Sequence, residues 1–283
     1  MMQNRDIDMD LQEFRGILGE ALAEGGSQRL LRLTDEEIAV LDPDSLTDCV
    51  APTPRLGELS EQEREWAYAT ALRSLVSREA VEVGNIDELD ALLRKADAQP
   101  ETASQPSGVD VDLRIAPEVS LALTLRRSAD RALAVEQHTS AGVAHTLVYV
   151  HADDLFLVER VTSGGLHMFS LASSAADAAD VVRLAVDPFE VADKDGRAQQ
   201  LTAEQINAQD VGRPLNDAIN GALVVGQLVV LADAPGPLLT TYATEDSVWT
   251  VHVEKPQAVS GITARPVGTN TLRKMITQLI LPS

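Results

Sequence analysis

The chain has 283 residues, of which 45% are hydrophobic but only 3% aromatic, and its formal net charge is −21. That length is enough for one large domain or two ordinary ones, with a core filled mainly by alanine, valine and leucine. The negative charge repels nucleic-acid backbones and anionic membranes, so we expect no nucleic-acid partner and no membrane insertion.

Residues 1–97 carry the patterns of a helical N-terminal region. Apolar side chains recur at helical spacing from 10 to 23, and two capping boxes, Thr34 with Glu37 and Ser60 with Glu63, predict further helix starts. A short strand at 80–83 and a helix at 87–98 are also expected. The helix that follows Ser60 is predicted to turn these side chains inward: Trp66, Ala69, Leu72, Leu75 and Val76.

Residues 98–108, AQPETASQPSG, form a linker by composition, because they are polar, contain two prolines and show no periodicity. The segment 109–187 then reads as a helix, four strands and a second helix. Turn residues separate the strands, as hairpins require. The strands are predicted at 132–137, 145–151, 155–161 and 166–171.

The same order returns after a connection at 188–211, where Thr202 with Gln205 predicts a short capped helix. Residues 212–283 again read as a helix, four strands and a helix. The first helix of this segment has proline near its start, where its missing N–H costs nothing. These strands are predicted at 227–231, 238–242, 248–253 and 262–265.

The two units also match in detail. LVYVHADDLFLVERV at 147–161 and TTYATEDSVWTVHVE at 240–254 align at a constant offset of 93 residues. This agreement predicts an α+β fold of two quasi-repeated helix–four-strand–helix units, which form one antiparallel sheet flanked by helices across a pseudo-twofold axis. The aligned pairs include Tyr149 with Tyr242, Phe156 with Trp249, Val182 with Met275, and Val186 with Leu279.

Candidate chemistry is sparse. The histidines, His138, His145, His151, His167 and His252, are interpreted as surface or hairpin-end residues. Cys49 lies among carboxylates that raise a thiol pKa, and Asp153 with Asp154 reads as a turn. No nucleotide-binding or hydrolase motif is present. We therefore predict no catalytic, cofactor-binding or metal residues and no enzyme activity, while the partner-binding residues stay undetermined. Phe156 and Trp249 could serve as core residues or as exposed partner anchors.

The stretch LFLVERVTSGGLHMFSL, followed by a helix, and the ending SVWTVHVEKPQAVSGITARPVGTNTLRKMITQLI resemble the EspG family of actinobacterial type VII secretion chaperones. The resemblance covers roughly residues 110–283, and LTDEEIAVL is loosely similar to the family's opening helix. It implies a non-enzymatic cytoplasmic protein that holds helical secretion substrates, the PE–PPE pairs. It carries over no binding residue, because no motif matches position by position.

Two functions follow as hypotheses. The first is a cytoplasmic binding protein or EspG-like chaperone with a helical protein partner. The alternative is an acidic, immunity-like or regulatory protein that neutralises one specific protein partner through its charged surface, and high salt would weaken that complex steeply. No cofactor is expected in either case, and the sequence is compatible with a homo-oligomer. The polar, acidic N-terminal residues show no secretory signal, which favours the cytoplasm.

Overall fold

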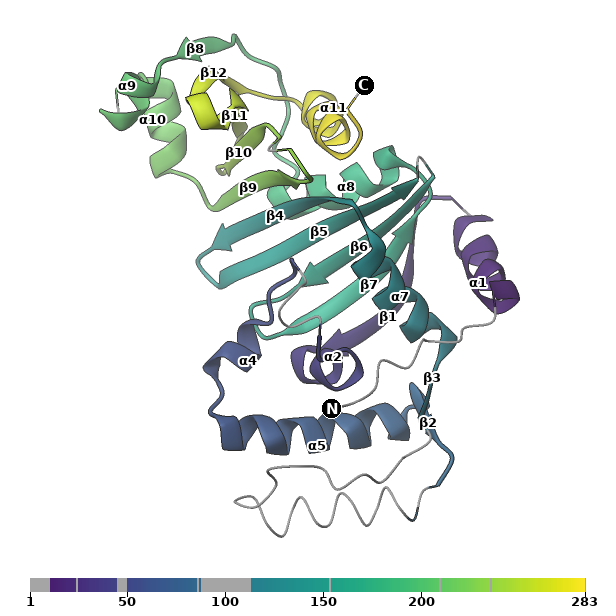
Figure 1. Cartoon of the computed structure of the whole chain (residues 1–283). Helices are drawn as coiled ribbons and strands as arrows, with labels where there is room; N and C mark the ends of the chain where they lie inside the picture. Colours follow the sequence, from purple (N-terminus) through teal and green to yellow (C-terminus); the bar gives the residue numbers. More distant parts are fainter. Residues whose placement is uncertain are drawn as a thin grey trace.

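The computed structural model describes residues 11–23, 25–44, 50–85, 87, 113–152, 154–208, 210–234 and 236–282. Its centre is a ten-stranded sheet in the order β1-β7-β6-β5-β4-β9-β10-β11-β12-β8, in which every pairing is antiparallel (Figure 1). The predicted α+β class is confirmed. The strands are β1 (Ser27–Thr34), β4 (Arg131–Thr139), β5 (Gly142–Ala152), β6 (Leu155–Val161), β7 (Leu166–Ala172), β8 (Gln199–Leu201), β9 (Val224–Leu231), β10 (Leu238–Ala243), β11 (Val248–Lys255) and β12 (Ser260–Pro266).

The two halves of the sheet join at β4 and β9, the first strands of the two repeats. β4 pairs with β5, which carries Tyr149, and β9 pairs with β10, which carries Tyr242. The two pairs have the same register, so the offset of 93 residues holds for these four strands. Val135 therefore corresponds to Leu228, and these two residues pair directly with each other. A residue that faces its own equivalent lies on a symmetry axis. The pseudo-twofold axis thus passes through the β4–β9 junction, as the repeat predicts.

The constant offset fails beyond the first hairpin of each repeat. Tyr149 pairs with Leu157, eight residues on, whereas Tyr242 pairs with Trp249, seven residues on. A register shift in the β5–β6 pair accommodates the extra residue. The alignment of Phe156 with Trp249 was therefore wrong. Phe156 packs with the α8 side of the sheet and Trp249 with the opposite side, because a one-residue slip reverses the face of a strand.

Helices cover both faces of the sheet (Figure 1). The closing helices α8 and α11 pack side by side on one face, and their aliphatic side chains form a core with both halves of the sheet. On the other face, α1, α2 and α7 cover the first half, with α5 packed behind α2, and α10 with α9 packs on the second half. The helices are α1 (Leu11–Ala23), α2 (Asp35–Leu41), α4 (Pro54–Glu58), α5 (Glu61–Ser77), α7 (Pro117–Ser128), α8 (Ala175–Val186), α9 (Ala203–Asn207), α10 (Arg213–Asn220) and α11 (Thr269–Ile280), with a 3-10 turn η1 (Pro256–Ala258).

Both outer edges of the sheet are occupied by strands that the sequence did not predict. β1 pairs with β7 and the three-residue β8 pairs with β12. β8 is only three residues long, and β1 carries a register shift between Arg29 and Leu31 that interrupts its alternation. The predicted strand at 80–83 is confirmed as β2 (Val81–Val83), which pairs with β3 (Leu113–Ile115). The predicted linker at 98–108 and the helix at 87–98 lie outside the described residues, apart from residue 87.

The capping boxes of Thr34, Ser60 and Thr202 all form as predicted. The inward position of Trp66 was wrong, because it is 52% exposed. Leu75 is fully buried as predicted, and Ala71 of the same helix is buried with it. At about 100° per residue, Trp66 lies roughly 180° around the helix from Leu75, so the two cannot share a face.

Candidate functional site

A buried charge network lies between the N-terminal helices and the sheet. His167 of β7 contacts two carboxylates: its Nδ1 lies 2.6 Å from Glu159 Oε1 and its Nε2 lies 2.6 Å from Asp35 Oδ1. Glu159 also accepts a hydrogen bond of 2.6 Å from the Tyr149 hydroxyl and one of 3.1 Å from Arg126 Nε. The side chains of His167, Glu159, Asp35 and Arg126 are all fully buried. We refer to these five residues as the buried network.

The network fixes the protonation of its histidine. A neutral imidazole has one N–H, whereas both ring nitrogens of His167 face carboxylate oxygens, so the imidazolium fits best. Burial lowers the His167 pKa, but hydrogen bonds to Asp35 and Glu159 outweigh it and the pKa is raised. Burial likewise raises the Glu159 pKa, yet its hydrogen bond with His167 and the Arg126 charge leave that pKa lowered. The network then places two cationic side chains, Arg126 and His167, against two carboxylates, Glu159 and Asp35.

The interpretation of His167 as a surface or hairpin-end residue was therefore wrong. The alternation of side chains along a strand could have revealed this, because residues two apart point to the same face of the sheet. His167 shares its face with the buried Phe169 in β7, and Glu159 shares its face with the buried Leu157 in β6. An ionisable residue at a buried position on each of two neighbouring strands predicts a pair. These side chains are enclosed, and their contacts join α2 and α7 to three strands of the sheet.

Acidic side chains in and just after helix α2 form the hydrogen bonds and ion pairs that connect the N-terminal region to the rest of the protein. Its Asp35 also accepts a hydrogen bond of 2.6 Å from the Arg55 backbone N–H, and its Glu37 lies 2.7 Å from Nη2 of Arg78, the residue that follows α5. Asp42, just after the helix, is buried and pairs with Arg127 of α7. Asp35 and Glu37 of α2, together with Asp42, thus place acidic groups against the sheet, the end of α5 and α7, and so tie all three together.

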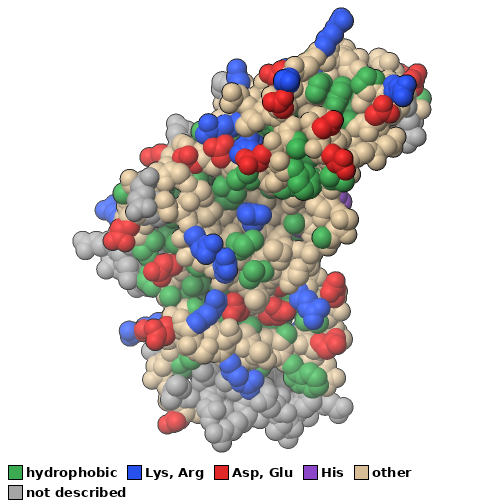
Figure 2. Space-filling model, turned by 180° about the vertical axis from the view of Figure 1, so that it is seen from behind, with side chains coloured by type: hydrophobic (Ala, Val, Ile, Leu, Met, Phe, Trp, Pro, Cys, Tyr) green, Lys and Arg blue, Asp and Glu red, His purple; other side chains and the backbone are tan. Residues whose placement is uncertain are grey.

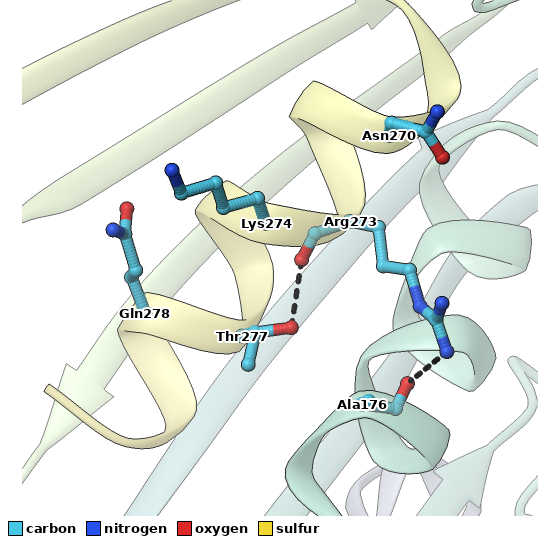
Figure 3. Close-up of a pocket in the computed structure, with 6 residues that line it drawn as sticks. All are labelled: Ala176, Asn270, Arg273, Lys274, Thr277 and Gln278. Carbon is cyan, nitrogen blue, oxygen red and sulfur yellow. Dashed lines mark hydrogen bonds between the residues drawn. The ribbon is translucent and has the colours of Figure 1, made fainter. Parts of the chain in front are cut away.

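A shallow hollow of about 340 Å³ lies between α8 and α11 (Figure 3). Arg273 reaches across to the carbonyl of Ala176 and pairs with Asp180 at 2.7 Å, while Lys274 points away from it. Thr277 donates to the Arg273 carbonyl oxygen along α11. The lining contains no histidine, cysteine or carboxylate, so the hollow offers no acid–base pair. Its lining residues are Ala176, Asn270, Arg273, Lys274, Thr277 and Gln278.

An uncovered part of the central sheet is the more informative surface. Val229 is 39% exposed although β9 is the sixth of ten strands, and its neighbour Gln227 is also exposed. Helix α7 lies over the other end of the first half, and among the described elements no helix lies in front of the ends of β4 and β5 near their shared turn (Figure 1). We call this surface the open face; it consists of Glu136, His138, His145, Val225, Gln227, Val229, Leu231 and Leu238, all on one side of β4, β5, β9 and β10.

The side of the molecule seen in Figure 2 carries both acidic and basic side chains. In Figure 2, acidic and basic side chains are interspersed over most of the visible surface, with hydrophobic clusters between them. A mixed surface of this kind is typical of solubility rather than of electrostatic capture. The net charge of −21 is therefore not gathered into one acidic patch on this side.

The remaining candidates occupy unremarkable positions. Phe156 is fully buried and Trp249 is half-buried beside α10, so neither is an exposed anchor. Asp154 is exposed at its turn, while Cys49 and Asp153 lie outside the described residues. Across the described part of the chain, no group of three or more His, Cys, Asp and Glu side chains could hold a metal ion, and no helix is long and apolar enough to cross a membrane.

Comparison with known proteins adds no further constraint: no family model and no curated protein matches the chain.

Proposed function

We propose that this protein is a non-enzymatic binding protein that holds a helical protein partner against the open face. The observation that carries the proposal is the exposure of Val229 on a strand in the middle of a ten-stranded sheet. Val229 adjoins Leu231 and Leu238 on the same side of the sheet, and a contiguous apolar patch on an open sheet face is typical of an interaction site. The enclosure of the buried network, the main cluster of ionisable side chains, supports a binding role over catalysis.

The proposal extends to an EspG-like chaperone of the cytoplasm, which would hold helical type VII secretion substrates. Support comes from the sequence resemblance and from two helix–four-strand–helix units that share one sheet. A helix suits the open face because the backbone groups of β4 and β9 are already paired on both sides. An added strand would instead pair along an outer edge of the sheet, at β1 or β8, and would not cover the open face.

The test is purification of the tagged protein from its native host as wild type, as Val229→Lys and as Leu184→Lys. Leu184 is the matched control, since it is 48% exposed but lies on α8 across the sheet. We expect a stoichiometric helical partner with wild type and Leu184→Lys, and at least a roughly tenfold loss with Val229→Lys. Equal recovery with both variants, or no partner at all, would contradict the proposal. Circular dichroism verifies that both variants are folded.

The net charge of −21 favours a second candidate, the acidic immunity-like or regulatory protein. Its complex would depend on long-range attraction, which is largely screened at 1 M salt, where the Debye length is about 3 Å. The same purification repeated in high salt separates the two. A complex that survives salt and depends on Val229 supports the first function, and one that dissociates in salt and tolerates Val229→Lys supports the second.

A further inference from the structure

The pseudo-twofold axis shows which residues of the open face occupy equivalent places. With the offset of 93 that holds for β4, β5, β9 and β10, Glu136 corresponds to Val229. By the same rule His138 corresponds to Leu231, and His145 corresponds to Leu238. Related positions sit in matching backbone environments on the same side of the sheet. A difference in side chain between them therefore reflects what each half contacts, not where it lies.

The two halves of the open face differ in chemistry at all three positions. The first half carries a carboxylate and two imidazoles, and the second carries three aliphatic side chains. Glu136 and His138 keep about half of their side-chain surface exposed, with 2.5 Å between Glu136 Oε1 and His138 Nε2. His145 lies directly opposite Glu136 on β5. The open face is thus divided into an ionisable half and an aliphatic half on either side of the axis.

The aliphatic half favours a partner with a row of apolar side chains, because burying apolar surface against apolar surface releases water from both. The ionisable half selects a cation, since Glu136 is the single carboxylate among the residues of the open face and no lysine or arginine accompanies it. Burial lowers the pKa of His145, which the nearby Glu136 opposes, so that imidazole stays neutral at neutral pH. A side chain of the partner that both donates hydrogen bonds and carries positive charge complements this half.

A second copy of this chain fits the open face poorly. In a twofold dimer each open face would meet its own copy, so two Glu136 carboxylates would enter one interface. Each chain also carries a net charge of −21, and the repulsion between two such molecules opposes association. The ionisable half and the aliphatic half therefore call for a partner of different composition.

We propose that the open face takes an amphipathic helix whose apolar ridge packs on Val229, Leu231 and Leu238 and whose neighbouring lysine or arginine pairs with Glu136. The inference rests on the proposed function, because it names the class of partner for the same face. Side chains at i, i+3, i+4 and i+7 form such a ridge, and the next positions around the helix reach the ionisable half.

The test uses two synthetic helical peptides with the same leucine ridge, one flanked by lysines and the other by glutamates. Binding to the full chain is measured by fluorescence anisotropy at about pH 8, where an ordinary histidine is neutral. Methyl NMR spectra report the position of the peptide. We expect the lysine peptide to bind more tightly and to shift the methyl signals of Val229, Leu231 and Leu238.

Two matched variants separate local pairing from general attraction. Glu136→Gln should weaken the lysine peptide about two- to fivefold, the range of a partly exposed ion pair, whereas Glu65→Gln on the exposed side of α5 should leave it unchanged. Leu238→Asn should weaken both peptides. Equal effects of the two glutamate variants, methyl shifts confined to other surfaces, self-association through the open face, or no binding at millimolar peptide would each overturn the inference.

The outcomes also separate this inference from the proposed function. If the native partner depends on Val229 but tolerates Glu136→Gln, the open face binds and only the cationic pairing is wrong. If the lysine peptide binds with the expected pattern while no native partner depends on Val229, the chemistry of the face stands and the proposed function fails.

Discussion

The side chain of Glu159 shows how much one buried residue can control. It receives Tyr149 and Arg126 on one oxygen and contacts His167 with the other. Ionised groups in a protein interior are costly unless each is paired and hydrogen-bonded, so the network is stable only as a whole. Its members come from α2, α7, β5, β6 and β7, which ties elements far apart in sequence.

Removing one member should therefore be far more costly than removing a surface pair. We expect Glu159→Gln to lower the free energy of unfolding by about 3–5 kcal/mol, because Arg126 and His167 would remain buried without their full counter-charge. Urea denaturation measures the change. Glu58→Gln, which breaks an exposed pair with Arg55, is the control and should cost less than about 1 kcal/mol. Similar losses in both variants would show that the network does not stabilise the fold.

The network also sets a pH window for stability. The His167 pKa is raised from 6.5, so its contribution is complete below that value and is lost as the pH rises through the folded pKa. The Glu159 pKa is lowered from 4.5, so its contribution is complete above that value and is lost as the pH falls through the folded pKa. Both contributions are present between 4.5 and 6.5.

We thus expect the urea midpoint to be highest between these values and to fall on the alkaline side. In His167→Asn the alkaline fall should be reduced, since the titrating group is gone. A wild-type midpoint that rises from neutral to alkaline pH would contradict this assignment.

At the scale of elements, β9 can approach α8 closely because the residue at the contact, Gly226, has no side chain. A Cβ added at Gly226 would lie 2.7 Å from Val186 Cγ1 and 2.5 Å from Thr241 Oγ1. The close approach lets α8 cover the β4–β9 junction, where Gln137 donates a hydrogen bond of 2.6 Å to the Ala185 carbonyl. The glycine is therefore a packing requirement of this junction.

Gly226→Ala should destabilise the protein by about 1–3 kcal/mol, because α8 or β10 must move to admit the methyl group. Gly57→Ala in α4 is the matched control, since nothing lies within 4 Å of its added Cβ. We expect that change to be neutral or slightly stabilising, as alanine favours helix over glycine. Thermal unfolding of both variants provides the comparison, and equal losses would remove the steric argument.

At the scale of the whole molecule, the two repeats share one sheet and one core. Val135 and Leu228 pair across the axis, and α8 and α11 pack together beneath both halves. Neither half can bury its inner face alone. The two similar units therefore share one continuous sheet and one core, and we expect them to behave as one cooperative unit.

One cooperative unit should unfold in a single transition. The chain has two tryptophans, so in Trp66→Phe the fluorescence reports Trp249 of the second half alone. We expect its urea midpoint to coincide with the midpoint from far-ultraviolet circular dichroism, which reports the whole chain. Two separated transitions would indicate that the halves unfold independently.

The sequence alone determined the two repeats and the order of their helices and strands. Period-two and period-3.6 patterns, turn residues and capping boxes depend on neighbours along the chain, and they located nine strands: β2 and the eight strands of the two repeats. The repeat also predicted the joined sheet, because two similar meanders each leave an edge to be paired.

Only the tertiary structure decided which residues meet. The edge strands β1 and β8, the one-residue longer hairpin before Phe156, and the burial of His167 between Asp35 and Glu159 depend on contacts between segments far apart in the sequence. The open face belongs to the same group, because exposure is set by where helices do not pack. Local patterns describe how a chain prefers to bend, whereas burial and ion pairing are properties of the assembled layers.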